Sequence, residues 1–531
     1  MLTTCFLHVR ILRAIRFLYL PFALKSCSIA ETHVYLMTKP ITKIGLIQTA
    51  PLPGDFSNNL RAIVQGYRDC LDHGAEVVVA SAAALCGLEP QSLVNRRSFI
   101  SQAQQALQTL ASELSSAPLF LAAYTLTVSD DELYVGIAGE DDEEEDPWMA
   151  NDRRIVLTPY LLEKDSITEL SNGETLELQG MRFYIDTTDD EALPDGTPDF
   201  IVRLPGTPWY GGSARDEEEA RSWEANMEGC HLICCRPVGT AGGNIYGGGS
   251  AVYSAAGKTL QRLPFFEVAS KVVDITRPAL ARHLPEEAGL MSLALQRGIR
   301  DSVRNNGFTG ACLNLDHPHS ALLGALCVEA LGTANVSGVS FTPGNKLAEQ
   351  LGIQVYTPDT TALNQAATAA LGGEESRHLQ ERLQTALALT HAEARGMMLC
   401  SPLCRRELML GEFCTYGMSG GQLAPLGNLY DVDIFLLCEH LGEKYPQLFG
   451  SLTEPPHGVT NRIIHELADC NTAPSVLLNK EKNYLFKEND VRLIQRKILA
   501  SALKRAQLPV ILHVDPKDEQ LKFPISHRLN D

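Results

Sequence analysis

Apolar and polar positions follow two different periodicities along the first half of the chain. Short runs rich in apolar and β-branched residues predict buried strands, because both faces of such a strand pack against other elements. These runs occupy 43–49, 76–80, 118–125 and 182–186. Between the first two runs, apolar residues recur at the spacing of one helix face: Leu60, Ile63, Val64, Tyr67 and Leu71. A second helix is predicted over 99–115, and this order of elements indicates an α/β fold.

The alternation is interrupted around residues 276–288 and then resumes. Prolines and clustered charges break the pattern there, which predicts a boundary between two domains, 41–280 and 281–531. Beyond the boundary, apolar runs predict further strands at 336–341 and 351–356, and the C-terminal third is expected to be mostly helical.

In the second half, an apolar run at 308–313 is followed by a turn and by a helical pattern at 321–331. A strand, a tight turn and a helix N-terminus form the arrangement that binds phosphate in nucleotide sites, because backbone N–H groups and the helix dipole face the anion. Such turns use glycine, which lets the backbone approach the phosphate closely. Residues 316–319 are Asp-His-Pro-His instead. The scaffold of an ATP site is therefore predicted without its phosphate-binding residues.

Composition excludes some classes of partner. The chain has 531 residues with 45% hydrophobic residues, which suffices for two domains with ordinary cores. A formal net charge of −19 argues against nucleic-acid partners and against anionic membrane surfaces, and no internal segment is apolar for long enough to span a membrane. The 14 cysteines are scattered without paired zinc-binding spacing. This usage indicates reduced thiols in a cytoplasmic protein.

Residues 1–40 differ in composition from the rest of the chain. They carry basic residues, no acid before Glu31, and an apolar run at 17–24. Two interpretations are compatible with this pattern: a targeting leader, or a mis-assigned start with Met37 as the first residue. The apolar run is short and contains a proline, which favours the second interpretation.

The acidic run at 140–146 is expected to be a solvated loop.

Short motifs occur in a fixed order over residues 41–531. In the first domain they are Gln48, Gly54-Asp55 with Asn59, Leu85-x-Gly87, Thr207-Pro208-Trp209 and the segment from Val238 to Ser250. In the second domain they are Ala330-Leu331-Gly332, the run from Glu407 to Gly417, the run from Pro425 to Tyr430, and the run from Lys504 to Pro509. Taken in this order, the motifs resemble those of glutamine-dependent NAD synthetases.

The resemblance implies a fold and an activity. The N-terminal domain is expected to be a nitrilase-like glutaminase, a carbon–nitrogen hydrolase with an α-β-β-α sandwich. The C-terminal domain is expected to be a doubly wound α/β synthetase domain of the SGGxDS type. Such enzymes release ammonia from glutamine with a Glu-Lys-Cys triad, and they use ATP and Mg²⁺ to amidate deamido-NAD. The resemblance also implies an oligomer, either of identical chains or with an active paralogue.

The positions that carry glutamine hydrolysis in this family are replaced here. Ala82 stands at the position of the general base, where no group can now accept a proton. Arg154 stands at the position of the lysine and keeps the charge with a different shape. Thr188 stands at the position of the nucleophile, and a threonine hydroxyl without an adjacent base attacks poorly at neutral pH. The sequence therefore predicts that no catalytic triad is intact.

The SGGxDS loop of the family aligns with Leu315, Asp316, His317, Pro318, His319 and Ser320. Only the final serine is kept; proline removes a backbone donor, and an ionised Asp316 would repel a phosphate leaving group. Glu407 is a possible remnant of a second ATP-binding turn. The spacing of His317 and His319 is compatible with zinc, but no third ligand is evident, so no metal site is predicted.

These replacements predict a degenerate glutamine-dependent NAD synthetase. The leading hypothesis is a pseudoenzyme without either activity, with a binding or regulatory role in NAD metabolism. The ATP and Mg²⁺ that the family implies are expected to be lost. The alternative hypothesis is a residually active NAD synthase, or an altered ATP-dependent amide ligase that uses Arg405, Arg406 and Ser320.

Overall fold

The structure is a computed structural model that describes residues 40–128, 153–188, 196–279, 284–373, 376–417, 420–449, 458–478 and 486–514. The stretch Pro40–Asp531 forms one compact unit. The predicted leader up to residue 39 and the acidic run at 140–146 lie outside the described residues. Among the helices that are described, none combines the length and the apolar character that crossing a membrane requires.

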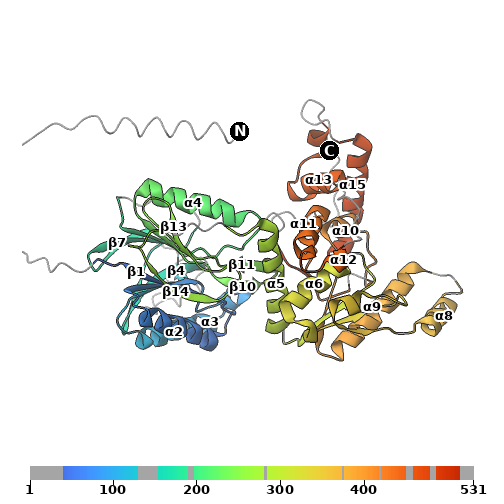
Figure 1. Cartoon of the computed structure of the whole chain (residues 1–531), viewed down its shortest axis with the longest axis horizontal. Helices are drawn as coiled ribbons and strands as arrows, with labels where there is room; N and C mark the ends of the chain where they lie inside the picture. The colour runs from blue at the N-terminus through green and yellow to red at the C-terminus, as the bar shows by residue number, and fades with distance from the viewer. Residues whose placement is uncertain are drawn as a thin grey trace, which may run out of the picture. The chain divides into compact units, whose positions relative to one another are not determined.

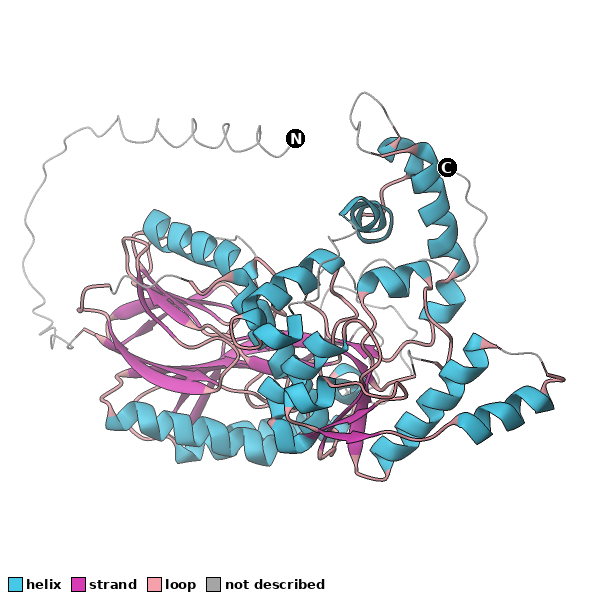
Figure 2. Ribbon diagram, turned by 45° about the vertical axis from the view of Figure 1, so that its right-hand side comes forward, coloured by secondary structure: helices cyan, strands magenta, loops and turns pink. Residues whose placement is uncertain are grey.

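Two six-stranded sheets form the N-terminal part of the unit (Figure 2). The first sheet has the order β14 (Ala269–Asp274), β1 (Lys43–Gln48), β2 (Val77–Ala82), β3 (Leu119–Val128), β4 (Arg153–Glu163) and β5 (Ser166–Glu169). The second has the order β13 (Thr259–Arg262), β12 (Ala251–Tyr253), β9 (His231–Cys234), β8 (Phe200–Arg203), β7 (Met181–Asp186) and β6 (Glu174–Leu178). In the first sheet β1, β2 and β3 run parallel, and β4 returns antiparallel to β3.

Helices cover the outer face of each sheet. Side chains of α2 (Phe56–Asp72) and α3 (Arg97–Glu113) share a core with the first sheet, and α4 (Ser213–Glu228) packs on the second (Figure 1). Between the sheets, Phe120 of β3 packs with Phe183 and Phe200 of the second sheet. Successive side chains of a strand point to opposite faces of its sheet, so each sheet contributes to the core beneath its helices and to the core between the two sheets. The expected α-β-β-α sandwich is confirmed.

A parallel sheet organises the C-terminal part. Its order is β17 (Gln354–Tyr356), β16 (Val336–Val339), β15 (Gly310–Asn314), β18 (Met397–Cys400), β19 (Leu423–Ala424) and β20 (Val510–Ile511). Ala311 and Leu313 of β15 face a core shared with α5 (Glu287–Asn305) and α6 (Ser320–Leu331). Cys312 between them faces a separate core with α9 (Arg377–Glu393). Helices therefore cover both faces, and the expected doubly wound architecture is confirmed.

The remaining elements connect or extend these layers. They are the hairpin β10 (Val238–Ala241) and β11 (Asn244–Gly247), and the helices α7 (Leu347–Leu351), α8 (Thr361–Ala370), α10 (Arg405–Leu410), α11 (Asp431–Gly442), α12 (Pro446–Phe449), α13 (Gly458–Ile464), α14 (Pro474–Leu477), α15 (Glu488–Ala500) and α16 (Ala502–Arg505). The strand expected at 351–356 begins only at Gln354, because α7 continues to Leu351 and ends at Gly352, whose φ is +69°.

Candidate functional site

The order of the C-terminal sheet reverses beside β15. From β15 the chain proceeds outward to β16 and β17, whereas β18 returns on the other side of β15, with β19 and β20 beyond it. In doubly wound folds, ligands bind at such a point, because the loops at the carboxyl ends of the two central strands diverge and leave a crevice. The loop after β15 and the loop after β18 meet here, and the candidate site is built from them.

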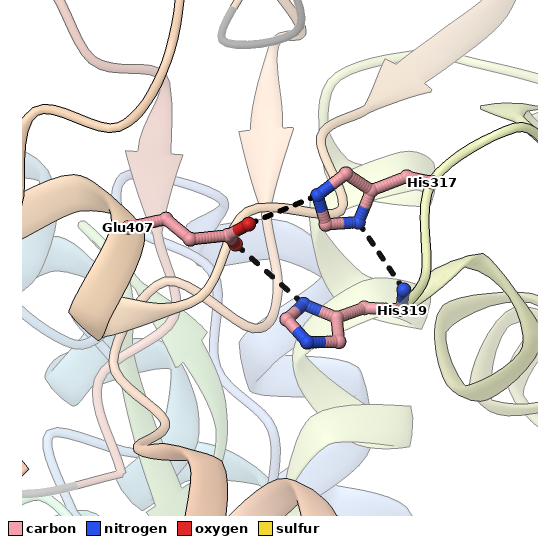
Figure 3. Close-up of side chains that lie close together, drawn as sticks. All are labelled: His317, His319 and Glu407. Atoms are coloured by element: carbon pink, nitrogen blue, oxygen red, sulfur yellow. Dashed lines mark hydrogen bonds and ion pairs between the residues drawn. The ribbon is translucent and has the colours of Figure 1, made fainter. Parts of the chain in front are cut away.

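Three side chains meet at the reversal point (Figure 3): His317 and His319 from the loop after β15, and Glu407 from the first turn of α10, which follows the loop after β18. Nε2 of His317 lies 3.1 Å from Oε1 of Glu407, and Nδ1 of His319 lies 3.6 Å from Oε2. The three side chains are between 8% and 14% exposed. His317 and Glu407 are 90 positions apart in sequence. The fold therefore brings a third ligand-type side chain to the two histidines, which the sequence alone did not indicate.

Glu407 is held by the start of α10. Its Oε2 accepts a hydrogen bond of 2.9 Å from the N–H of Cys404, as in a capping box. Burial raises the pKa of Glu407, but the hydrogen bond from His317, the charges of both histidines and the Cys404 N–H outweigh it and lower the pKa to about 2. Burial lowers the pKa of His319, although Glu407 opposes this. Glu407 is therefore ionised at neutral pH.

Backbone N–H groups of the loop after β15 bond to other groups of the protein instead of being available to a phosphate. Leu315 N–H donates to the carbonyl of Val339 at 2.9 Å, and Asp316 N–H donates to Oδ1 of Asn314 at 3.0 Å. His319 N–H donates to Nδ1 of His317 at 3.2 Å, and Ser320 N–H donates to the carbonyl of His317 at 3.0 Å. Pro318 has no N–H to offer. Phosphate-binding loops need these groups to be available.

Side chains of the loop also form hydrogen bonds that fix its conformation. Asp316 accepts hydrogen bonds from Ser340 Oγ at 2.7 Å, Phe341 N at 2.6 Å and Asn345 Nδ2 at 3.1 Å. Ser320 Oγ donates to the carbonyl of Asn314 at 2.6 Å. Asp316 is thus a structural carboxylate that closes the turn after β16. With these contacts and those of Glu407, the residues present do not fit the ATP and Mg²⁺ that the family implies.

The two arginines named in the alternative hypothesis form ion pairs within the protein. Arg405 is buried and pairs with Asp469. Arg406 donates to Asp431 at 3.0 Å and to Glu412 at 2.6 Å. Each guanidinium is therefore paired with carboxylates of the chain itself, which reduces the attraction that it offers to a substrate phosphate.

In the N-terminal part, the fold brings the region of Ala82 close to β4 and β7. Ala82 ends β2 and is fully buried. A Cβ atom placed on Gly206 would lie 3.9 Å from Cβ of Ala82 and 3.7 Å from Cδ2 of Leu157. The carbonyl of Leu157 accepts a 3.1 Å hydrogen bond from the hydroxyl of Thr187. Arg154 lies farther along β4, where its backbone pairs with Thr127.

The structure corrects one point about Thr188. Its N–H and its hydroxyl each donate to Oδ1 of Asp186 at 2.8 Å, so a carboxylate does lie beside the hydroxyl. Asp186 also pairs with Arg203, which is fully buried and bonds to Glu224 at 2.6 Å. Oδ2 of Asp186 contacts the guanidinium of Arg203, and its Oδ1 accepts both hydrogen bonds from Thr188. Both oxygens of Asp186 are therefore engaged, and the carboxylate positions Thr188.

Three cysteines near this region are candidate nucleophiles. Cys230, Cys234 and Cys235 are buried, and burial raises the pKa of Cys230 and of Cys235 to about 12. Burial also raises the pKa of Cys234, whose thiol donates to Glu217 at 3.1 Å. Thiols in this state are protonated at neutral pH and are poor nucleophiles. His231 to Cys234 of this segment form strand β9.

Comparisons with known proteins agree with the motif order and the fold. The family model for NAD synthase matches residues 292–456. A glutamine-dependent NAD(+) synthetase from Synechocystis sp. is 24% identical over 534 residues, which cover 87% of this chain and 94% of that protein. An NH(3)-dependent NAD(+) synthetase from Finegoldia magna is 30% identical over 165 residues, which cover 28% of this chain and 67% of that protein.

A solved structure extends the match in fold to both parts of the chain. The glutamine-dependent NAD(+) synthetase from Cytophaga hutchinsonii superimposes with a TM-score of 0.76 at 14% identity, covering 92% of this chain and 98% of the other. At this identity the likeness concerns the fold alone, and it includes both the sandwich and the parallel sheet. With the sequence matches, it shows that the chain belongs to the glutamine-dependent NAD(+) synthetase family.

Proposed function

We propose that this chain keeps the two-part fold of its family without catalysing NAD synthesis, and that it acts by binding, as a regulatory or structural subunit in NAD metabolism. The observation that carries the proposal is the state of the loop after β15. Four of its N–H groups, those of Leu315, Asp316, His319 and Ser320, bond within the protein, and Pro318 has none. Binding a triphosphate there would require these bonds to be broken first.

The N-terminal site supports the same proposal independently. Ala82, the residue at the position of the family's general base, has a methyl group in place of a carboxylate. The hydroxyl of Thr188 donates to Asp186, whose charge is balanced by buried Arg203. Loss of one or more members of a catalytic unit typically costs on the order of 10⁴ to 10⁶ in kcat. A glutaminase with these replacements is expected to be inactive.

The structure offers no support to the alternative of residual or altered activity. That hypothesis relied on Arg405, Arg406 and Ser320 as groups that could contact a nucleotide. Arg405 pairs with Asp469, Arg406 with Asp431 and Glu412, and the Ser320 hydroxyl donates to a backbone carbonyl.

An assay for NAD formation tests the proposal. Purified chain is supplied with ATP, Mg²⁺ and deamido-NAD, and with either glutamine or ammonia as nitrogen donor; an active glutamine-dependent NAD(+) synthetase serves as the positive control. We expect no NAD above a mock preparation with either donor, because both sites lack their reacting groups. Sustained NAD formation with ammonia would overturn the proposal for the C-terminal site, and formation with glutamine would overturn it for both.

The binding role predicts an assembly, either of identical chains or with an active paralogue. Sedimentation of the chain alone, and of the chain mixed with the active enzyme, measures both forms. We expect a species larger than the monomer in at least one of the two samples. A monomer in both, with no change in the rate of the active enzyme, would contradict the binding role while leaving the lack of catalysis unaffected.

A further inference from the structure

The cluster formed by His317, His319 and Glu407 has the composition of a transition-metal site. We propose that these three side chains bind one divalent transition-metal ion, with Zn²⁺ as the best match, at the place where the family's ATP loop has been replaced. Two imidazoles and one carboxylate are a common ligand set for zinc, with a fourth position open to water. The inference goes beyond the proposed function and does not depend on it, because metal binding is measured separately from NAD formation.

The distances within the cluster suit a tetrahedral ion. Two ligand atoms that each lie about 2.0–2.1 Å from a tetrahedral zinc are about 3.3 Å apart. His317 Nε2 and Glu407 Oε1 are 3.1 Å apart, and His319 Nδ1 and Glu407 Oε2 are 3.6 Å apart. All three ligand atoms lie within 4.8 Å of one another. Small side-chain rotations bring these atoms to coordination distance.

A buried nitrogen that lacks a hydrogen-bond partner points to a ligand. Among the described residues, Nδ1 of His319 is inaccessible to solvent and makes no hydrogen bond. It faces Oε2 of Glu407 at 3.6 Å, which is too long for a hydrogen bond but suitable for two ligands of one ion (Figure 3). Buried polar atoms are nearly always satisfied, and an exception needs an explanation. A metal ion between the two side chains supplies one.

Metal binding requires a change in His317. Its Nδ1 accepts a hydrogen bond from the N–H of His319 and its Nε2 faces Oε1 of Glu407, so a proton on Nε2 satisfies both contacts. Coordination through Nε2 moves this proton to Nδ1, so a metal–nitrogen bond replaces the hydrogen bond between Nε2 and Glu407, and the N–H of His319 loses Nδ1 as its acceptor. The turn at Pro318 must therefore adjust, and the ion and the loop conformation are coupled.

Two neighbouring groupings are weaker candidates. His319, Cys404 and Asp431 also lie close together, but Asp431 bonds to Arg406 at 3.0 Å, and burial raises the pKa of Cys404 well above its usual value. His378, Glu381 and Cys414 form a third grouping, in which His378 is exposed.

The ligand set also indicates which metal binds. The nitrogen ligands of the proposed site favour Zn²⁺ and Co²⁺ over Mg²⁺, so this site differs in chemistry from the magnesium site that an ATP enzyme would need.

The test titrates Co²⁺ into full-length, chelator-treated protein and follows visible absorption, since tetrahedral Co²⁺ absorbs strongly. We expect one Co²⁺ per chain, displaced by Zn²⁺ and not by excess Mg²⁺. His317→Asn and Glu407→Gln should each weaken Co²⁺ affinity by about 100-fold or more, because each removes a direct ligand. Thermal melts in the presence of chelator establish whether each variant is folded. Because the two substituted residues lie in different segments of the chain, one variant still tests the proposal if the other does not fold.

Two control variants locate the ion. His378→Asn and Cys404→Ser should bind Co²⁺ like the parent chain, because neither residue is a ligand in the proposed site. The proposal is overturned if the parent shows no tetrahedral absorption, or if folded Glu407→Gln and His317→Asn bind like the parent. Loss of binding in Cys404→Ser with retention in Glu407→Gln would place the ion in the neighbouring grouping instead, which also contradicts the assignment.

Discussion

Replacement of Arg203 by methionine should lower the free energy of unfolding by about 3–5 kcal/mol, which is the typical cost of removing one partner from a buried ion pair. Arg203 is fully buried and pairs with Asp186 and with Glu224; a second arginine, Arg221, contacts Glu224 at 3.0 Å. Two positive and two negative side chains therefore balance one another out of contact with water. Methionine fills a similar volume but leaves Asp186 and Glu224 to share the charge of Arg221 alone.

Chemical denaturation of the parent and the variant measures this effect. Arg68→Met is the matched control, because Arg68 pairs with Glu113 at 2.8 Å with side chains that are 60% and 45% exposed. An exposed pair contributes about 0–1 kcal/mol, so the control should unfold nearly like the parent. Equal, small effects of the two substitutions would show that the Arg203 cluster does not support the sandwich. The result bears on the site, because Asp186 also holds Thr188.

Restoring the three family residues together, as Ala82→Glu, Arg154→Lys and Thr188→Cys, should create measurable glutamine hydrolysis. Because replacements within a catalytic unit cost on the order of 10⁴ to 10⁶ in kcat, recovery of even part of this range is at least on the order of a 100-fold rise above the parent background. Gly206, which has no side chain, lies beside Ala82. Ammonia release from glutamine is the readout.

The double variant without the cysteine, Ala82→Glu with Arg154→Lys, is the control for this experiment. It should remain inactive, because it has a base and a cation but no thiol to attack the amide. A triple variant that melts cooperatively like the parent yet releases no ammonia would contradict the assignment of these positions. Activity in the double variant would contradict the role given to position 188.

Local patterns predicted most elements that surround the two sites. The helix with Leu60, Ile63 and Tyr67 on one face is α2, and these side chains face the first sheet as expected. The strand, turn and helix around residues 315–320 are β15, the loop and α6. These features depend on residues close in sequence, so periodicity and turn composition were sufficient to find them.

Contacts between distant segments could not be predicted in the same way. Nothing in the sequence near His317 indicates that a carboxylate 90 positions later faces it, because that contact depends on β18 pairing with β15. The strand β18 was not predicted from its four residues. Similarly, the ion pair between Arg203 and Asp186 depends on β8 lying beside β7.

The most direct measurement is a crystal structure of the chain grown with ATP, Mg²⁺ and deamido-NAD at concentrations that saturate active relatives. We expect the loop from Leu315 to Ser320 to keep its internal hydrogen bonds, with no triphosphate ordered beside α6. An ATP molecule whose phosphates accept hydrogen bonds from these same N–H groups, with Mg²⁺ bound to Glu407, would contradict the account.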